Sequence, residues 1–178
     1  MENVSDKVYK VTKSKTVRMI TSGMWFLLVV VFVPVWYVFL CEPFNLTVFI
    51  IMSAATLFAL GVVLYYWFIS PKGVELTDCA LVLHRVVGRK VFRYADIAEA
   101  GLWTGKPSDM FRCWGSGAFC GFIGWFSGGG LGTHFEYVGS YDDAFYIRLR
   151  GGRTYLLGCD GAEQAVDRVR SNMPATSC

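Results

Sequence analysis

Two long apolar runs occupy the first part of the chain. They read MITSGMWFLLVVVFVPVWYVFL (19–40) and LTVFIIMSAATLFALGVVLYYWFI (46–69), and Glu42 is the one charged residue within residues 19–70. Each run exceeds the roughly 20 residues that a helix needs to cross a bilayer core. The first run is too long for the core of a signal peptide, and no A-x-A cleavage site follows it. The pattern therefore predicts a two-helix transmembrane hairpin.

Short segments that alternate apolar and polar residues follow the hairpin, and this period of two predicts β-strands. We expect seven antiparallel strands, at residues 73–78, 80–88, 90–97, 99–104, 133–140, 144–151 and 153–158. Gly151-Gly152 is a hairpin signal between the last two. Before the first helix, the basic segment Lys7–Arg18 could bind anionic lipid, or Val8–Val11 could add a further strand to the same domain.

The last periodic segment predicts an amphipathic helix. Asp160 is a candidate N-cap, and Glu163 lies three residues later, which is similar to a capping box. Apolar residues then follow helical spacing at Ala162, Ala165, Val166 and Val169. Seven antiparallel strands and one C-terminal helix predict an all-β domain, built as a bent sheet or partly open barrel that the helix closes.

Charge and composition divide the chain into four parts: a basic segment (1–18), the hairpin (19–70), a folded domain (71–172) and a tail (173–178). Lysine and arginine lie before the first span and after the second, whereas the hairpin loop has none. The positive-inside rule therefore predicts a multi-pass protein of the inner (plasma) membrane with both termini in the cytoplasm. A net charge of only +3 gives no case for nucleic-acid binding.

The segment CWGSGAFCGFIGWFSGGGLG (113–132) is rich in glycine and aromatic residues and carries no charge. It lacks the Gly-Lys-Ser/Thr ending and the strand-to-helix setting of a phosphate-binding loop. Its densest apolar part, residues 118–126, is too short for a third span. Two interpretations stay open. Either the segment folds back onto its own domain as a long connection, or some of its apolar side chains enter the inner leaflet. Those side chains are Phe119, Phe122, Ile123, Trp125 and Phe126.

The order of these elements and one motif resemble membrane-attached bacterial proteins with a pleckstrin-homology-like (PH-like) domain. The motif of that family runs from Arg through Gly-Ser-Gly and alternating aromatic residues and glycines to Leu-Gly and a strand with a Tyr. It maps onto Arg112, Gly115, Ser116, Gly117, Phe119, Gly121, Phe122, Gly124, Phe126, Leu131, Gly132 and Tyr137. The resemblance covers about residues 73–172. It implies the PH-like fold and membrane attachment, and it supplies no catalytic residues.

Basic residues surround the predicted turn between the second and third strands, at Arg85, Arg89, Lys90 and Arg93. Basic loops of PH-like domains can bind anionic headgroups, and the same charges would also arise from the positive-inside bias on a solvated strand edge. We expect contact with lipid or with a partner at these residues or at Phe122, Trp125 and Phe126.

The sequence offers no constellation typical of catalysis, of a metal site or of a cofactor site. Ser116 lacks the G-x-S-x-G setting of a nucleophile elbow, and Cys113, Cys120, His84 and His134 match no zinc spacing. We therefore predict a non-enzymatic binding or scaffolding protein without metal or cofactor. Its partners would be anionic headgroups, a membrane protein or a second copy of the chain.

The alternative is an accessory subunit of a membrane transporter or channel. Small residues in the two spans would permit close contacts between helices. They are Gly23, Ser53, Ala54, Ala55 and Gly61.

Overall fold

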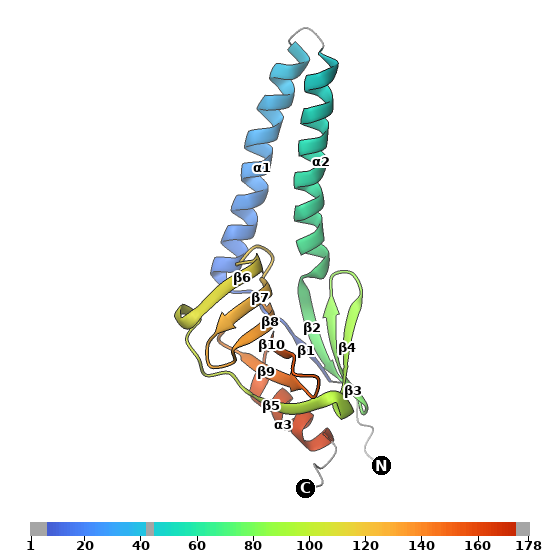
Figure 1. Cartoon of the computed structure of the whole chain (residues 1–178), viewed down its shortest axis with the longest axis vertical. Helices are drawn as coiled ribbons and strands as arrows, with labels where there is room; N and C mark the ends of the chain where they lie inside the picture. The colour runs from blue at the N-terminus through green and yellow to red at the C-terminus, as the bar shows by residue number, and fades with distance from the viewer. Residues whose placement is uncertain (1–6, 42–44, 174–178) are drawn as a thin grey trace.

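The computed structural model describes residues 7–41 and 45–173, and it shows two long helices standing on a β-rich domain (Figure 1). Helix α1 (Lys15–Cys41) continues through Pro34, and α2 (Leu46–Ile69) returns beside it. Both predicted helices are confirmed, and both are long and apolar enough to cross a membrane. Most of the predicted connection at residues 41–45, and all but the first residue of the predicted tail, lie outside the described residues.

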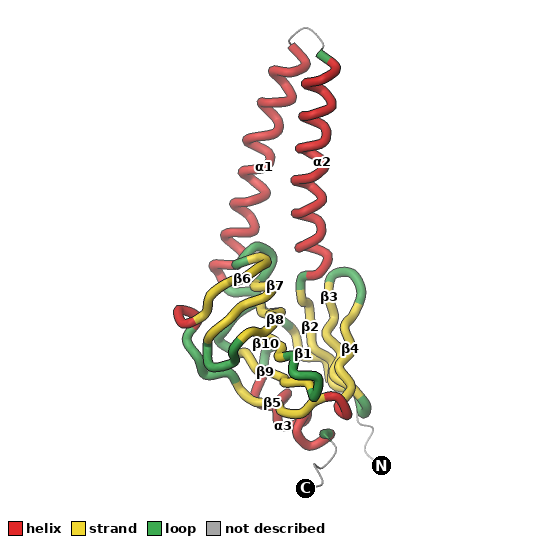
Figure 2. Tube along the Cα trace, in the orientation of Figure 1, coloured by secondary structure: helices red, strands yellow, loops and turns green. Residues whose placement is uncertain are grey.

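The strands form two sheets (Figure 2). The four-stranded sheet contains, in spatial order, β1 (Lys7–Lys10), β2 (Pro71–Leu76), β3 (Ala80–Arg85) and β4 (Arg89–Arg93). The six-stranded sheet contains, in spatial order, β5 (Ile97–Leu102), β9 (Ala144–Leu149), β10 (Thr154–Gly158), β8 (Thr133–Val138), β7 (Phe122–Gly128) and β6 (Met110–Ser116). Short 3-10 turns at Tyr94–Asp96 and Pro107–Asp109 precede β5 and β6.

The helical hairpin is inserted between two neighbouring strands of one sheet. Strand β1 precedes α1 and β2 follows α2, yet the two strands pair antiparallel, with Lys7 opposite Leu76 and Lys10 opposite Gly73. Tyr9 and Val11 are buried in the main core. Of the two roles considered for the N-terminal segment, the structure shows the added strand, and the segment contributes directly to the domain.

The residues described contain ten strands, whereas the sequence predicted seven. The seven predicted strands are all present, and the additional ones are β1, β6 and β7. The pair β8 and β10 is parallel, although an entirely antiparallel sheet was expected. Strands β6 and β7 escaped prediction because glycine interrupts both, once in β6 and twice in β7, and glycine removes the alternation of apolar and polar side chains on which strand prediction depends.

The main core lies between the two sheets and the C-terminal helix α3 (Ala162–Asn172). Helix α3 packs on β5, β9 and β2, and it buries the apolar residues predicted for that face, Ala162, Ala165, Val166 and Val169. The predicted N-cap is wrong, because Gly161 occupies that position with φ of 77°. Asp160 instead accepts hydrogen bonds from the amide and hydroxyl of Thr12, which ties the start of α3 to the segment after β1.

Candidate functional site

The tip of the β6–β7 hairpin lies between the two long helices. We call this tip, residues 117–121, the wedge. The amide of Cys120 donates a 2.9 Å hydrogen bond to the hydroxyl of Thr21 in α1. On the other side, the Ser70 hydroxyl at the end of α2 donates a 2.6 Å bond to the Cys120 carbonyl. Phe119 and Cys120 are buried against Val63 of α2. The wedge therefore fixes the domain to both helices.

Two glycines of the predicted family motif let β6 and β7 approach each other closely. Gly115 and Gly124 have φ of 123° and 147°, in the region that side chains disfavour. A Cβ on Gly124 would lie 2.2 Å from the Trp114 carbonyl oxygen, and one on Gly115 would lie 2.3 Å from that of Ile123. These glycines thus serve the close contact of two strands that carry the wedge.

Several further motif residues lie at the wedge or beside it. The hydroxyl of Ser116 donates a 2.8 Å bond to the carbonyl of Phe119 and closes the tip. Arg112 extends over Gly117, because a Cβ on that glycine would lie 2.6 Å from a guanidinium nitrogen. Gly121 is buried where the chain enters β7. The part of the motif from Arg112 to Gly124 therefore builds the wedge, whereas Leu131 and Gly132 lie in the β7–β8 turn and Tyr137 on β8.

The apolar residues of the glycine-rich segment divide between two environments. Ile123 and Phe126 are buried in the domain, whereas Phe119 is buried against the helices. Phe122 is half-buried with its ring 4.5 Å from that of Tyr141, and Trp125 remains 37% exposed. The segment thus packs on its own domain along β7, and its tip reaches the helices.

Two of the four basic candidates point into the domain. The ammonium of Lys90 lies 4.2 Å from the ring centroid of Tyr155. It also lies within 5.4–5.6 Å of three further rings, those of Tyr137, Phe92 and Phe135. Burial raises the pKa of Tyr137, and the positive charge of Arg85 partly offsets this effect. Lys90 therefore holds the two sheets together in an aromatic box.

The remaining basic candidates lie at opposite ends of β4. The β3–β4 turn contacts the end of α2, where the amides of Val86 and Val87 donate bonds to the carbonyls of Ser70 and Phe68, 3.0 and 2.9 Å long. Arg89 follows this turn and is exposed. Arg93 is also exposed but pairs with Ala80, at the end of the sheet away from the helices. The structure therefore brings Arg85, Arg89 and Lys90 near the helices and separates Arg93 from them.

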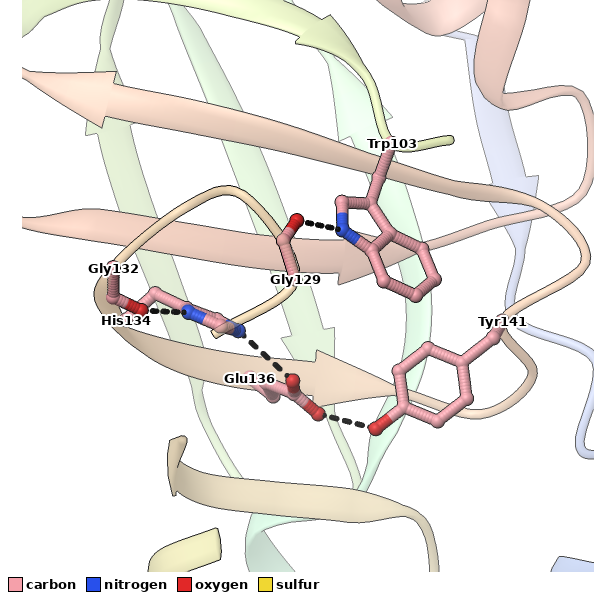
Figure 3. Close-up of polar contacts among 6 residues, drawn as sticks. All are labelled: Trp103, Gly129, Gly132, His134, Glu136 and Tyr141. Carbon is pink, nitrogen blue, oxygen red and sulfur yellow. Dashed lines mark hydrogen bonds and ion pairs between the residues drawn. The ribbon is translucent and has the colours of Figure 1, made fainter. Parts of the chain in front are cut away.

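A buried polar network lies on the face of β8 opposite to Phe135 and Tyr137, the residues that face Lys90 (Figure 3). His134 Nε2 lies 2.9 Å from a Glu136 oxygen, and both side chains are fully buried. The other Glu136 oxygen accepts a 2.6 Å bond from Tyr141, and His134 Nδ1 lies 2.9 Å from the Gly132 carbonyl. The indole of Trp103 donates a 3.0 Å bond to Gly129 and anchors the same turn.

The network favours the protonated form of His134, because its pKa is raised. Burial by itself would lower the pKa of His134, but the hydrogen bonds to Glu136 and to the Gly132 carbonyl outweigh it and raise that pKa. Burial and Glu136 raise the pKa of Tyr141. Sequence reasoning missed this network, although the i, i+2 spacing of His134 and Glu136 on a strand was a usable signal. Because both side chains are sealed from solvent, the arrangement orders the β7–β8 turn.

In residues 7–41 and 45–173, no three His, Cys, Asp or Glu side chains gather closely enough to hold a metal ion. We compared the chain with protein-family models, with curated proteins and with solved structures, and none of them matches it. The assignment of a function therefore depends on the geometry of the chain itself.

Proposed function

We propose that the chain is a two-span inner-membrane protein that presents a PH-like domain to the cytoplasm as a non-enzymatic binding or scaffolding module. Its partner is a protein or an anionic lipid headgroup. The observation that carries this proposal is the wedge, hydrogen-bonded on one side to Thr21 and on the other to Ser70. A domain fixed in this way keeps one face against the membrane.

The exposed surface of the helices supports the membrane location. Phe26, Leu57 and Phe58 are 71%, 70% and 75% exposed. Val17 and Val63 are the only buried residues of α1 and α2, which the structure describes along their whole length. Apolar surface of this extent requires lipid or protein around it. Because β1 pairs with β2, the start of α1 and the end of α2 must lie on the same side of the membrane. The basic residues near these two ends favour the cytoplasmic side.

The strand order supports the PH-like fold. Strands β5, β9 and β10 form an antiparallel meander, and together with β1–β4 and α3 they make seven strands and one C-terminal helix. The number matches the seven strands of the resemblance, but the set differs, because the prediction counted β8 (Thr133–Val138) and not β1 (Lys7–Lys10). Strands β6, β7 and β8 then form an antiparallel insertion between β5 and β9, attached through the parallel pair β8–β10. The insertion carries the wedge.

Rigid attachment suits a module that acts at the membrane surface. The wedge and the β3–β4 turn contact the helix ends at separate points, so the domain has little freedom to swing away. The hairpin also confines the domain to a thin layer, where a high local concentration compensates for weak individual contacts. Arg89 is exposed and follows the β3–β4 turn, whose amides bond to the end of α2, so this geometry holds it near the helices.

Amide hydrogen exchange of the full chain in nanodiscs tests the proposal. The discs contain phosphatidylcholine alone or a mixture with phosphatidylglycerol, at low and high salt. A headgroup-binding module shows slower exchange in the β3–β4 turn with phosphatidylglycerol, and salt weakens the effect. Arg89→Gln removes this protection, and Arg93→Gln, at the other end of β4, preserves it.

If the chain is instead a scaffold for a protein, lipid composition does not change its exchange. The chain solubilised from native membranes then co-purifies with a stoichiometric protein partner. If lipid has no effect on exchange and the chain elutes without a partner, the binding or scaffolding function is wrong.

One observation favours the second candidate, an accessory subunit of a transporter or channel. A Cβ added at Gly23 or Gly61 would meet no atom within 4 Å, so neither glycine is used in the contact between α1 and α2. Both positions are therefore open to a helix of another protein. A chain that is a lone monomer in mild detergent would count against this candidate.

A further inference from the structure

A groove of 640 Å³ lies between the edge strand β6 and helix α2. Trp114 forms its wall on β6, and the α2 side consists of Phe58, Gly61, Val62, Tyr65 and Tyr66. Trp114 is 75% exposed, although it is the largest side chain on the strand. The groove is thus apolar, and Trp114 lines one side of it without filling it.

The groove extends far along α2. Phe58 lies eleven residues before Ile69, the last residue of the helix, which corresponds to about 16 Å at 1.5 Å per residue. Gly61 lies eight residues before that end, or about 12 Å. Under the proposed function, on which this inference rests, α2 spans the bilayer and the groove opens into the hydrocarbon of the leaflet next to the domain. Water does not fill such a space.

Arg112 lies beside this groove. A smaller groove of 250 Å³ shares Val62 and Tyr66 with the first and adds Arg112, Ser116 and Phe119. Arg112 is exposed, and none of the ion pairs found in the described part of the chain involves it. A guanidinium at the level where lipid headgroups begin is suited to a phosphate, which it binds through two parallel hydrogen bonds.

We propose that this groove binds one anionic phospholipid of the adjoining leaflet. An acyl chain lies along α2 against Trp114 and over Gly61, and the phosphate meets Arg112. The choice of a lipid over a second copy of the chain follows from charge complementarity, because Arg112 lacks an anionic partner where phosphates are plentiful. Membrane contact then falls on Trp114 of β6, whereas the sequence pointed to Phe122, Trp125 and Phe126 of β7.

Native mass spectrometry of the full chain in detergent tests the site directly. The delipidated protein is titrated with phosphatidylglycerol and, separately, with phosphatidylcholine. The wild type retains one phosphatidylglycerol in preference to phosphatidylcholine. Arg112→Gln weakens binding of phosphatidylglycerol by about tenfold or more and removes the preference, because a charge-assisted bond is lost.

Two pairs of variants separate the groove from general effects. Gly61→Leu fills the groove, whereas Gly23→Leu adds the same side chain to α1 at an equally open position. Trp114→Ala removes the wall, whereas Phe111→Ala removes a 71% exposed aromatic residue of the same strand that does not line the groove. We expect Gly61→Leu and Trp114→Ala to lose the bound lipid, and both controls to keep it.

Equal lipid retention in Gly61→Leu and Gly23→Leu overturns the inference. So does a fall in oligomeric mass with unchanged lipid binding in Gly61→Leu, which would show that the groove seats a second copy. Alkaline carbonate extraction of native membranes separates this inference from the proposed function. A chain that stays in the membrane while its groove variants bind lipid normally refutes the lipid site alone, whereas a chain that is extracted refutes membrane integration as well.

Discussion

The hydroxyl of Ser70 donates a 2.6 Å hydrogen bond to the carbonyl of Cys120, a residue fifty positions away in the chain. Ser70 directly follows the last residue of α2, and Cys120 lies in the wedge between β6 and β7. Together with the bond from the Cys120 amide to Thr21 of α1, this contact satisfies both backbone groups of one buried residue with side chains from two helices. The attachment of domain to helices is therefore specific in its geometry, and it can be tested one bond at a time.

Removal of the Ser70 hydroxyl should loosen the wedge. Ser70→Ala leaves the buried Cys120 carbonyl without its donor, which lowers the free energy of unfolding by about 1–3 kcal/mol. Thermal unfolding of the full chain in detergent measures this loss. Ser22→Ala, an exposed serine on α1, is the matched control. Equal melting temperatures for the two variants would contradict the structural role of the bond.

Thiol labelling of Cys120 should report the loosening of the wedge without unfolding the chain. Burial raises the pKa of Cys120, and Lys13 and Thr21 partly offset this effect. The buried neutral thiol should therefore react slowly with maleimide, whereas the exposed Cys79 reacts fast. Ser70→Ala should accelerate modification of Cys120 and leave Cys79 unchanged, as peptide mass mapping would show. Rapid labelling of Cys120 in the wild type would exclude the docked wedge.

Alanine at Gly124 should prevent proper formation of the β6–β7 hairpin. Its Cβ would lie 2.2 Å from the Trp114 carbonyl, in a backbone conformation that alanine disfavours. We expect a loss of at least about 3 kcal/mol from overpacking and strain together. Gly151→Ala adds the same methyl group to a site with no neighbour within 4 Å. Denaturant unfolding of the two variants provides the comparison, and similar midpoints would contradict the close crossing of the strands.

Replacement of Lys90 should weaken the packing of the two sheets. Lys90→Met keeps the apolar stem but removes the ammonium from the box around it, with a loss of about 1–2 kcal/mol of cation–π attraction. Arg89→Met removes one positive charge from the adjacent exposed position and should change stability little. If the Arg89 variant is the less stable one by thermal unfolding, the box does not stabilise the domain.

Stability should fall as the pH rises above about 6.5, through His134. The folded chain has a raised His134 pKa, so it keeps a proton that the unfolded chain releases near the ordinary value of about 6.5. The stabilisation is complete below that value and is lost as the pH rises through the folded pKa. The slope of melting temperature against pH should therefore be less negative in His134→Gln than in the wild type. Identical slopes would show that His134 does not titrate in this window.

The elements that the sequence predicted best are those set by local patterns. Helix α2 begins after Asn45, whose side chain accepts bonds from the amides of Thr47 and Val48, and it ends before Ser70, as the apolar run indicated. The buried face of α3 likewise follows directly from helical spacing. In both cases neighbours along the chain determine the outcome.

The features that escaped prediction depend on contacts between distant residues. Lys90 reads as a solvated charge until Tyr155 and Tyr137 from the other sheet surround it. Asp160 reads as an N-cap, but Thr12 from the start of the chain competes for its carboxylate. The wedge was hidden because its glycines indicate a flexible loop unless the two strands that they bring together are known.

The position of β1 ahead of the helices has a consequence for biogenesis. During synthesis β1 emerges first, and its partner β2 emerges only after both α1 and α2 have been made. A chain that inserted a single helix would leave Tyr9 and Val74 on opposite sides of the bilayer, with the four-stranded sheet incomplete and its apolar face open to proteases. Under the proposed membrane topology, closure of this sheet is a checkpoint: only a chain that has inserted both helices acquires a folded domain.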